Sequence, residues 1–171
     1  AVISNFFDLN NISNKFFFNY NLPPGRGDYK IIKFNKKKIH LIDESYNSNP
    51  LSLDFALKNF NKLQRNSKRK IILLGDMLEL GKFSKKLHLD AAKIVNKTNI
   101  NRVYVYGKRI TYTYNKIRPQ KRGKILYSSK DVSNFLKNDI KDGEYLMVKG
   151  SNSTGLNEMM KKLKLGKINA I

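Results

Sequence analysis

Apolar positions along the chain follow two periods: short runs typical of buried strands, and the three-to-four-residue spacing of amphipathic helices. The runs predict strands at residues 29–34, 39–43, 70–74, 102–106, 124–127 and 145–148. The helical spacing predicts helices at 50–64, 84–96, 109–117, 130–138 and 156–165. Alternation of strands and helices after residue 39 indicates an α/β fold, with a Rossmann-like, mostly parallel, doubly wound sheet covered by helices on both faces.

The chain before this alternation has a different character. Residues 1–22 contain apolar clusters that predict two short helical pieces, and Leu22–Gly27 follows with paired prolines and two glycines that cannot continue a helix. We therefore predict a helical stub of a preceding domain at 1–22, a hinge at 23–28 and the domain proper at 29–171. Because the chain begins with Ala1 rather than Met, we interpret its start as lying inside a longer polypeptide.

Composition narrows the possible partners. The 34 Lys and Arg against 13 Asp and Glu give a net charge of +21, which raises the possibility of a polyanionic partner. The basic residues are scattered through every predicted helix and turn, so we expect solvated faces rather than a nucleic-acid surface, with a charge that still favours nucleotides. The chain has no cysteine and two histidines, and no apolar run of membrane-spanning length, so we expect no metal site, no membrane contact and a cytoplasmic protein.

Four polar segments stand beside predicted strands in a characteristic order. They are Pro24-Gly25-Arg26-Gly27, Asp43-Glu44-Ser45-Tyr46-Asn47-Ser48-Asn49-Pro50, Gly75-Asp76-Met77-Leu78-Glu79-Leu80-Gly81 and Lys149-Gly150-Ser151-Asn152. In this order and spacing they resemble the C-terminal domain of the Mur ligases. The second and third strings resemble the branch of that family that adds D-Ala-D-Ala to UDP-N-acetylmuramoyl-tripeptide in peptidoglycan synthesis in the bacterial cytoplasm.

The resemblance implies an ATP-dependent reaction that forms a peptide bond. A substrate carboxylate is activated as an acyl phosphate and then attacked by the amine of the dipeptide, while the C-terminal domain closes to align the amine. The loop Gly-x-x-x-x-Gly-Lys-[Ser/Thr], which would hold ATP phosphates and Mg²⁺, does not occur in the 171 residues. We therefore expect ATP and Mg²⁺ to be bound mainly by a central domain outside this chain, no catalytic residue within it, and no activity of the chain alone. The expected partners are the N-terminal and central domains, in a monomeric enzyme.

The resemblance assigns five residues to ATP: Arg26, Asp43, Glu44, Tyr46 and Asn47. A carboxylate that accepts from both ribose hydroxyls is expected at Asp43 or Glu44, and the sequence leaves the choice between them open. Arg26, between two glycines, suits a phosphate or the nucleotide base, and its alternative role is a salt bridge to the neighbouring domain.

Six further residues are assigned to the substrate: Asn49, Asp76, Glu79, Lys149, Ser151 and Asn152. Asp76 and Glu79 are candidates for the amino end of the dipeptide, and Lys149 with the following hydroxyls for its carboxylate. The alternative roles are structural: Asn49 as the N-cap of a helix begun by Pro50, Glu79 as a cap of the next helix, and Asn152 or Ser153 as a cap of the last one.

Three other functions compete with this assignment. A Mur ligase of another specificity would carry a Tyr-Ala-His-Thr-Pro-like string in place of residues 46–50. A basic nucleic-acid-binding α/β domain would show binding that falls steeply with salt. A nicotinamide-binding domain would need the Gly-x-Gly-x-x-Gly fingerprint, which the 75–81 segment lacks.

Overall fold

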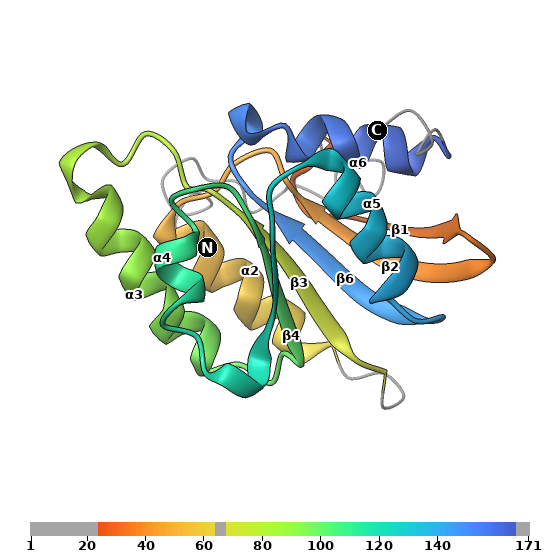
Figure 1. Cartoon of the computed structure of the whole chain (residues 1–171), viewed down its shortest axis with the longest axis horizontal. Helices are drawn as coiled ribbons and strands as arrows, with labels where there is room; N and C mark the ends of the chain where they lie inside the picture. The colour runs from red at the N-terminus through yellow and green to blue at the C-terminus, as the bar shows by residue number, and fades with distance from the viewer. Residues whose placement is uncertain (1–23, 64–67, 167–171) are drawn as a thin grey trace, which may run out of the picture.

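The computed structural model describes residues 24–63 and 68–166, so the predicted stub at 1–22 lies outside the described residues. Its centre is one six-stranded sheet in the order β1-β2-β6-β3-β4-β5 (Figure 1). The strands are β1 (Asp28–Phe34), β2 (Lys37–Glu44), β3 (Lys70–Gly75), β4 (Arg102–Tyr106), β5 (Arg122–Leu126) and β6 (Glu144–Lys149). Only the β1–β2 pair is antiparallel, which confirms the predicted mostly parallel sheet.

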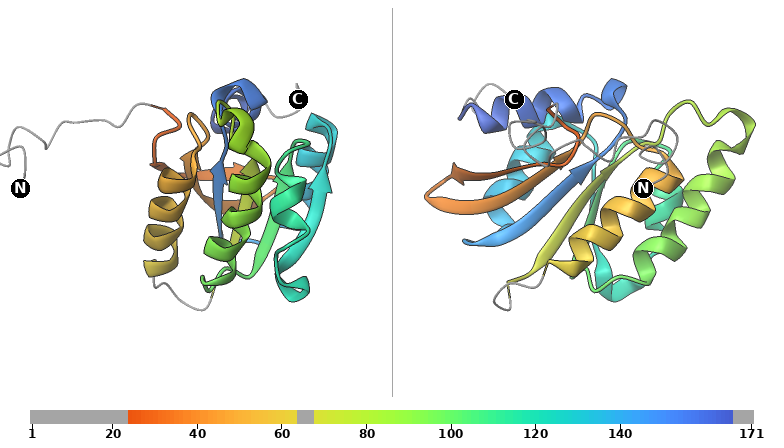
Figure 2. Two further views of the ribbon diagram at one scale, coloured as in Figure 1. Left: turned by 90° about the vertical axis from the view of Figure 1, so that its left-hand side faces the viewer. Right: turned by 180° about the vertical axis from the view of Figure 1, so that it is seen from behind.

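Helices cover both faces of the sheet (Figure 2). They are α2 (Pro50–Lys62), α3 (Ser84–Asn96), α4 (Thr111–Tyr114), α5 (Ser129–Asn138) and α6 (Leu156–Lys164), with single 3₁₀ turns η3 (Gly81–Phe83), η4 (Pro119–Lys121) and η5 (Asn152–Thr154). Two apolar clusters make the core. One joins α5 and α6 to the first face, and the other joins α2 and α3 to the second. The predicted doubly wound architecture is confirmed.

The predicted bounds agree with the observed ones to within two residues, except at the end of the helix predicted at 109–117. The strand predicted at 124–127 runs from Arg122 to Leu126, because the amide of Tyr127 donates to the Asp131 carboxylate in the capping box of α5. The helix predicted at 109–117 is reduced to Thr111–Tyr114, and the carbonyls of Asn115 and Ile117, past its end, accept hydrogen bonds from the Arg122 guanidinium.

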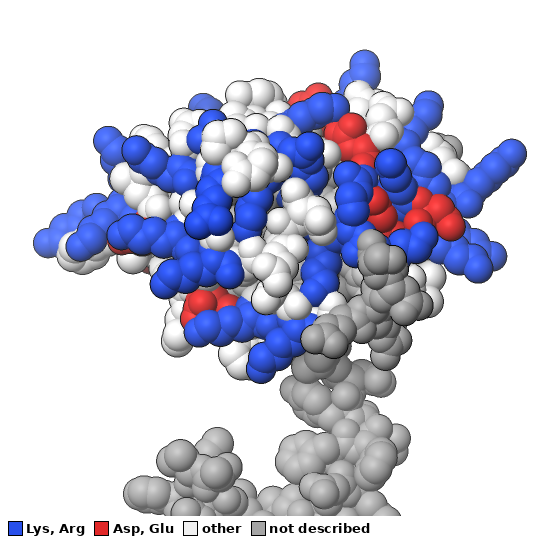
Figure 3. Space-filling view, turned by 90° about the horizontal axis from the view of Figure 1, so that it is seen from below, with Lys and Arg blue, Asp and Glu red and all other residues white. Residues whose placement is uncertain are grey.

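Lys and Arg side chains donate hydrogen bonds to backbone carbonyls at the C-terminal ends of the helices. Each of the five helices has a Lys or Arg from elsewhere in the chain donating to carbonyls in or just after its last turn. They are Lys70 at α2, Lys121 at α3, Arg122 after α4, Lys37 at α5 and Lys30 at α6. Cations are favourable there because the helix dipole leaves partial negative charge at that end. The underside of the molecule is strongly basic, with lysines and arginines spread across it (Figure 3).

Candidate functional site

The loops that follow β2, β3 and β6 meet at one edge of the sheet, as expected for the carboxyl ends of neighbouring parallel strands. Ser151 ties the three loops together. Its amide donates to the Asp76 carbonyl at 3.1 Å, and its Oγ accepts from the Leu78 amide at 3.0 Å and lies 3.4 Å from the Ser48 carbonyl. Ser151 is buried, so its hydroxyl is engaged within the protein. Its predicted contact with substrate stays a prediction.

These loops enclose a polar hollow of about 290 Å³. It is lined by Tyr46, Asn47, Leu78, Glu79, Ser151, Asn152 and Ser153. Five of these seven residues are ones that the sequence assigned to ligands, drawn from three separate motifs. The structure therefore brings together side chains that lie far apart in the sequence.

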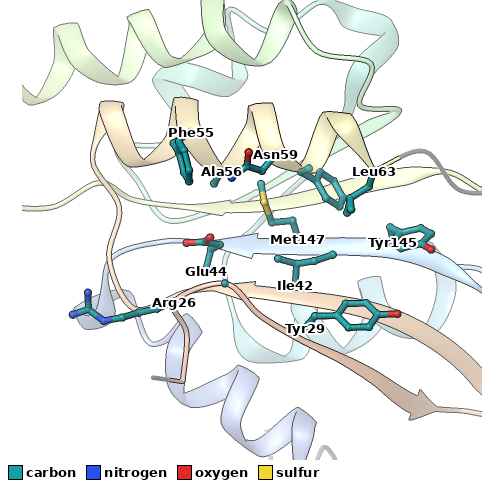
Figure 4. A pocket seen from close by; sticks show the side chains of 12 residues that line it. Arg26, Tyr29, Ile42, Glu44, Phe55, Ala56, Asn59, Leu63, Tyr145 and Met147 are labelled. Carbon is teal, nitrogen blue, oxygen red and sulfur yellow. The ribbon is translucent and has the colours of Figure 1, made fainter. Parts of the chain in front are cut away.

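A second, more apolar cavity of about 550 Å³ lies between β2 and α2 (Figure 4). Arg26 stands at one end of it, Glu44 lies on its floor, and Phe55 comes from α2. The Arg26 guanidinium stacks over the Tyr46 ring, 4.4 Å from the ring centroid. Because Tyr46 lines the polar hollow, the Arg26–Tyr46 pair stands where the two cavities approach each other.

The linker that carries Arg26 is held by backbone hydrogen bonds to the end of β2. Gly27 donates to the Asp43 carbonyl at 2.7 Å, and Tyr46 donates to the Gly25 carbonyl at 3.0 Å. Gly25 has a φ of +82°, and a Cβ there would lie 2.5 Å from Nδ2 of Asn157, so only glycine fits. The predicted hinge is thus fixed to the domain from Gly25 onward.

Asp43 and Glu44 point to opposite sides of β2. Asp43 is fully buried: its Oδ1 accepts from the amide and hydroxyl of Ser45, and its Oδ2 lies 2.5 Å from the Lys164 ammonium. Glu44 lines the β2–α2 cavity and is partly exposed. Of the two carboxylates, only Glu44 has a side chain that a nucleotide could reach.

Lys149 is buried beneath the loop that follows β2. Its ammonium donates to the Asn47 carbonyl at 2.9 Å and lies 3.4 Å from the Glu44 carboxylate. Burial lowers the pKa of Lys149, and the Glu44 charge opposes that shift. With 1% of its side chain exposed, Lys149 supports Glu44 and the loop from below.

Asn49 and Asp76 have structural partners. Asn49 is the N-cap of α2, with Oδ1 accepting from the Ser52 amide at 2.8 Å in a complete capping box. Asp76 accepts from the Ile110 amide at 2.7 Å and packs against Gly107, away from the polar hollow. The ligand contacts predicted for these two residues stay predictions.

Glu79 and Asn152 do not cap the helices that follow them. The α3 helix and the turn before it have no side-chain cap, and α6 begins after Gly155. Glu79 has a φ of +60°, an unfavourable conformation for a residue with a side chain, and it is one of the residues that line the hollow. Its carboxylate is the one negative charge among the lining residues of that hollow.

Two residues that hold the site were not predicted from the sequence. Lys164, at the end of α6, pairs with Asp28 and Asp43 below the linker, and no local pattern marks it. His88 is fully buried on α3 and contacts the 75–81 loop. Its position on the same helix face as Ala91, Ala92 and Val95 was the available signal that it is buried.

Two further features, a metal-binding cluster and a membrane-spanning helix, are absent from the described residues. Within 24–63 and 68–166, no group of three His, Cys, Asp or Glu side chains is placed to bind a metal ion. In the same part of the chain no helix is long and apolar enough to cross a membrane.

Comparison with known proteins gives concordant matches. The UDP-N-acetylmuramoyl-tripeptide–D-alanyl-D-alanine ligase of Buchnera aphidicola (subspecies Acyrthosiphon pisum) is 34% identical over 128 residues, covering 72% of this chain and 26% of that protein. The enzyme of the same name from Bacillus subtilis is 27% identical over 128 residues, covering 73% of this chain and 28% of its own length. The chain thus spans little more than a quarter of these relatives.

Solved structures show the same fold. The MurF ligase of Thermotoga maritima, crystallised with ADP, superposes with a TM-score of 0.73 at 18% identity, covering 99% of this chain and 36% of that one. A MurF structure from Acinetobacter baumannii gives a TM-score of 0.68 at 21% identity, covering 86% of this chain and 32% of that one. The family model described as Mur ligase, glutamate ligase domain, matches residues 30–152, and the chain belongs to that family.

Proposed function

We propose that the chain is the C-terminal domain of an ATP-dependent ligase that adds D-Ala-D-Ala to UDP-N-acetylmuramoyl-tripeptide. The observation that carries this proposal is the polar hollow, where residues of three family-like motifs converge beside the Arg26 linker. Family membership and the names of the relatives support the same reaction.

Each cavity has a part in this proposal. Glu44 accepts hydrogen bonds from the ribose hydroxyls of ATP, Arg26 and Tyr46 contact the nucleotide, and Asn47 lies between nucleotide and acceptor. In the hollow, Glu79 holds the amino end of the dipeptide close to the activated carboxylate. Asn152 and the Ser153 hydroxyl hold the other end of the dipeptide, and Ser151 holds the loops that carry them.

The phosphoryl chemistry belongs to the rest of the enzyme. The 171 residues contain no Gly-x-x-x-x-Gly-Lys-[Ser/Thr] loop, and the described residues offer no carboxylate cluster for Mg²⁺. We assign the phosphates and Mg²⁺ to a central domain, of which residues 1–22 form the tail, with residues 23–28 as the connection and 29–171 as the positioning domain. The complete enzyme is proposed to be monomeric and cytoplasmic.

The test is a coupled phosphate-release assay on the complete ligase, the polypeptide that joins this chain to its N-terminal and central domains. We expect phosphate release that requires ATP, UDP-N-acetylmuramoyl-tripeptide and D-Ala-D-Ala together, and none from residues 1–171 alone. Release driven by diaminopimelate or lysine with UDP-N-acetylmuramoyl-dipeptide, in place of the tripeptide precursor and D-Ala-D-Ala, would identify another Mur ligase specificity instead. Ligation by the 171-residue chain would refute the assignment of phosphoryl transfer to a domain outside this chain.

Glu44→Gln tests the nucleotide contact. We expect a rise in the KM for ATP of about tenfold with little change in the KM for D-Ala-D-Ala, because a neutral amide is a weaker acceptor than a carboxylate. The matched control is Asp54→Asn, which removes a partly exposed carboxylate on α2 that pairs, within the described residues, with Lys58. Equal effects of the two substitutions would refute the role of Glu44.

A further inference from the structure

The loop Gly75–Gly81, which supplies Leu78 and Glu79 to the polar hollow, is fixed by side chains outside it. Two consecutive backbone amides of the loop donate to such side chains: Met77 to Nε2 of His88 at 3.1 Å, and Leu78 to Oγ of Ser151 at 3.0 Å. Glu79 follows directly, at its positive φ. The direction of the Glu79 side chain therefore depends on how these two amides are held.

The two ring nitrogens of His88 have fixed and different roles. Because Nε2 accepts from the Met77 amide, the ring proton is on Nδ1, which donates to the Ser84 carbonyl at 2.8 Å. The neutral tautomer thus joins the first turn of α3 to the loop. His88 is fully buried, and the Thr113 hydroxyl donates to its backbone carbonyl at 2.6 Å, so the helix position is itself anchored by α4.

The charged groups around His88 are Asp76 in the loop and Arg109 before α4. Desolvation by burial is the largest influence and lowers the pKa of His88; the Asp76 charge acts in the opposite direction and Arg109 in the same one. The ring is therefore kept in the neutral form, in which Nε2 can accept a hydrogen bond.

We infer that His88 is a positioning residue for the dipeptide: its Nε2 holds the Met77 amide and thereby sets Leu78 and Glu79 in the polar hollow. This inference rests on the proposed function and adds to it a residue that does not touch substrate. His88 acts on the acceptor side only, since it contacts neither Arg26 nor Glu44 nor the β2–α2 cavity.

Two substitutions separate the two ring nitrogens. In His88→Gln the side-chain oxygen reaches the place of Nε2 and can still accept from the Met77 amide. In His88→Asn the shorter amide reaches the place of Nδ1 and can still donate to Ser84, but the Met77 amide is left without its acceptor. Both variants remove the ring, so loss of core packing is common to them.

In the complete ligase, His88→Asn should raise the KM for D-Ala-D-Ala by about tenfold, because a buried amide donor loses its partner. The KM for ATP should stay within about twofold, and His88→Gln should recover most of the KM for D-Ala-D-Ala. In the ¹⁵N-labelled 171-residue chain, hydrogen exchange at the Met77 amide should be faster in His88→Asn than in His88→Gln by a similar factor.

Equal effects of the two variants, in either measurement, would overturn the inference, since they would reduce His88 to a packing residue. A rise in the KM for ATP equal to that for the dipeptide would overturn it as well. A wild-type ligase that does not consume D-Ala-D-Ala would refute the proposed function, and the exchange rate of the Met77 amide would then decide by itself whether His88 holds the loop.

Discussion

Lys164→Met should destabilise the domain more than any other single substitution of a lysine at its surface. The Lys164 ammonium lies 2.5 Å from Oδ2 of Asp43 and 2.7 Å from Oδ2 of Asp28, and its side chain is 12% exposed. Burial alone would lower the pKa of Lys164, but its hydrogen bonds to the two carboxylates outweigh burial and raise the pKa. Methionine keeps the length of the side chain and removes the charge.

The size of the loss in unfolding free energy follows from the buried carboxylate that the substitution leaves without its cation. Asp43 has no exposed surface, so without Lys164 its carboxylate is a buried charge held only by the amide and hydroxyl of Ser45. Removal of one partner from a buried pair costs roughly 3–5 kcal/mol, and the partial exposure of Asp28 places the expected loss at about 3 kcal/mol. For a domain of this size that corresponds to a fall in Tm of about 6–12 °C.

The assay is thermal and urea unfolding of the 171-residue chain, followed by circular dichroism. Lys162→Met is the matched control, because Lys162 lies on the same helix in an exposed pair with Glu158, and we expect it to change stability by less than about 0.5 kcal/mol. Adding Asp43→Asn to Lys164→Met should restore part of the loss by removing the unpaired charge. A loss in Lys164→Met no larger than that in the control would refute the reasoning.

Three further outcomes are expected. Burial depresses the pKa of His88 in the folded protein. The stability that its neutral form contributes is therefore fully present above pH 6.5 and is lost as the pH falls through the lowered folded-state pKa. The urea midpoint should accordingly fall less between pH 7.5 and pH 5 in His88→Gln than in the wild type. Lys149→Met removes the cation beneath Glu44 and the Asn47 carbonyl, so the KM for ATP of the complete ligase should rise about fivefold. Gly107→Ala places a Cβ 2.6 Å from the Asp76 carboxylate carbon, at a φ of +125°. The substitution should lower the free energy of unfolding by about 2–3 kcal/mol, measured by thermal unfolding. The control is Gly166→Ala, which also has a positive φ but open space around the new Cβ, and it should cost about 1 kcal/mol.

Sequence periodicity predicted the fold because it reports burial, and burial decides the elements of this sheet. The strand at 70–75 is apolar at four consecutive positions, Ile71 to Leu74, and lies inside the sheet with helices on both faces. The helix at 84–96 was predicted to the residue. Errors arose at 109–117 and 124–127, where hydrogen bonds between side chains and the backbone, which hydrophobic spacing does not report, mark the ends of the elements.

The sequence predicted where the candidate site lies in the fold better than it predicted the contacts that its side chains make. Motif order and the geometry of parallel strands put Tyr46, Glu79 and Asn152 at one edge, where the structure has them. The choice between Asp43 and Glu44 could have been made from strand alternation, since Ile39, Leu41 and Asp43 share one side of β2. Lys164 could not have been predicted, because it meets Asp43 only through the tertiary fold.

The strand order also has a consequence for how the chain acquires its structure. Among the strands of the described sheet β6 is the last to be synthesised, yet it lies between β2 and β3 and joins the β1–β2 hairpin to the other three strands. Until residue 149 has left the ribosome, the hairpin has no place in the sheet, and its apolar residues Ile39 and Leu41 lack their final neighbours. Such long-range closure slows folding. A nascent or C-terminally truncated chain that ends before β6 would therefore lack the strand that joins the two parts of the sheet, and the sheet can be completed only after that strand has been synthesised.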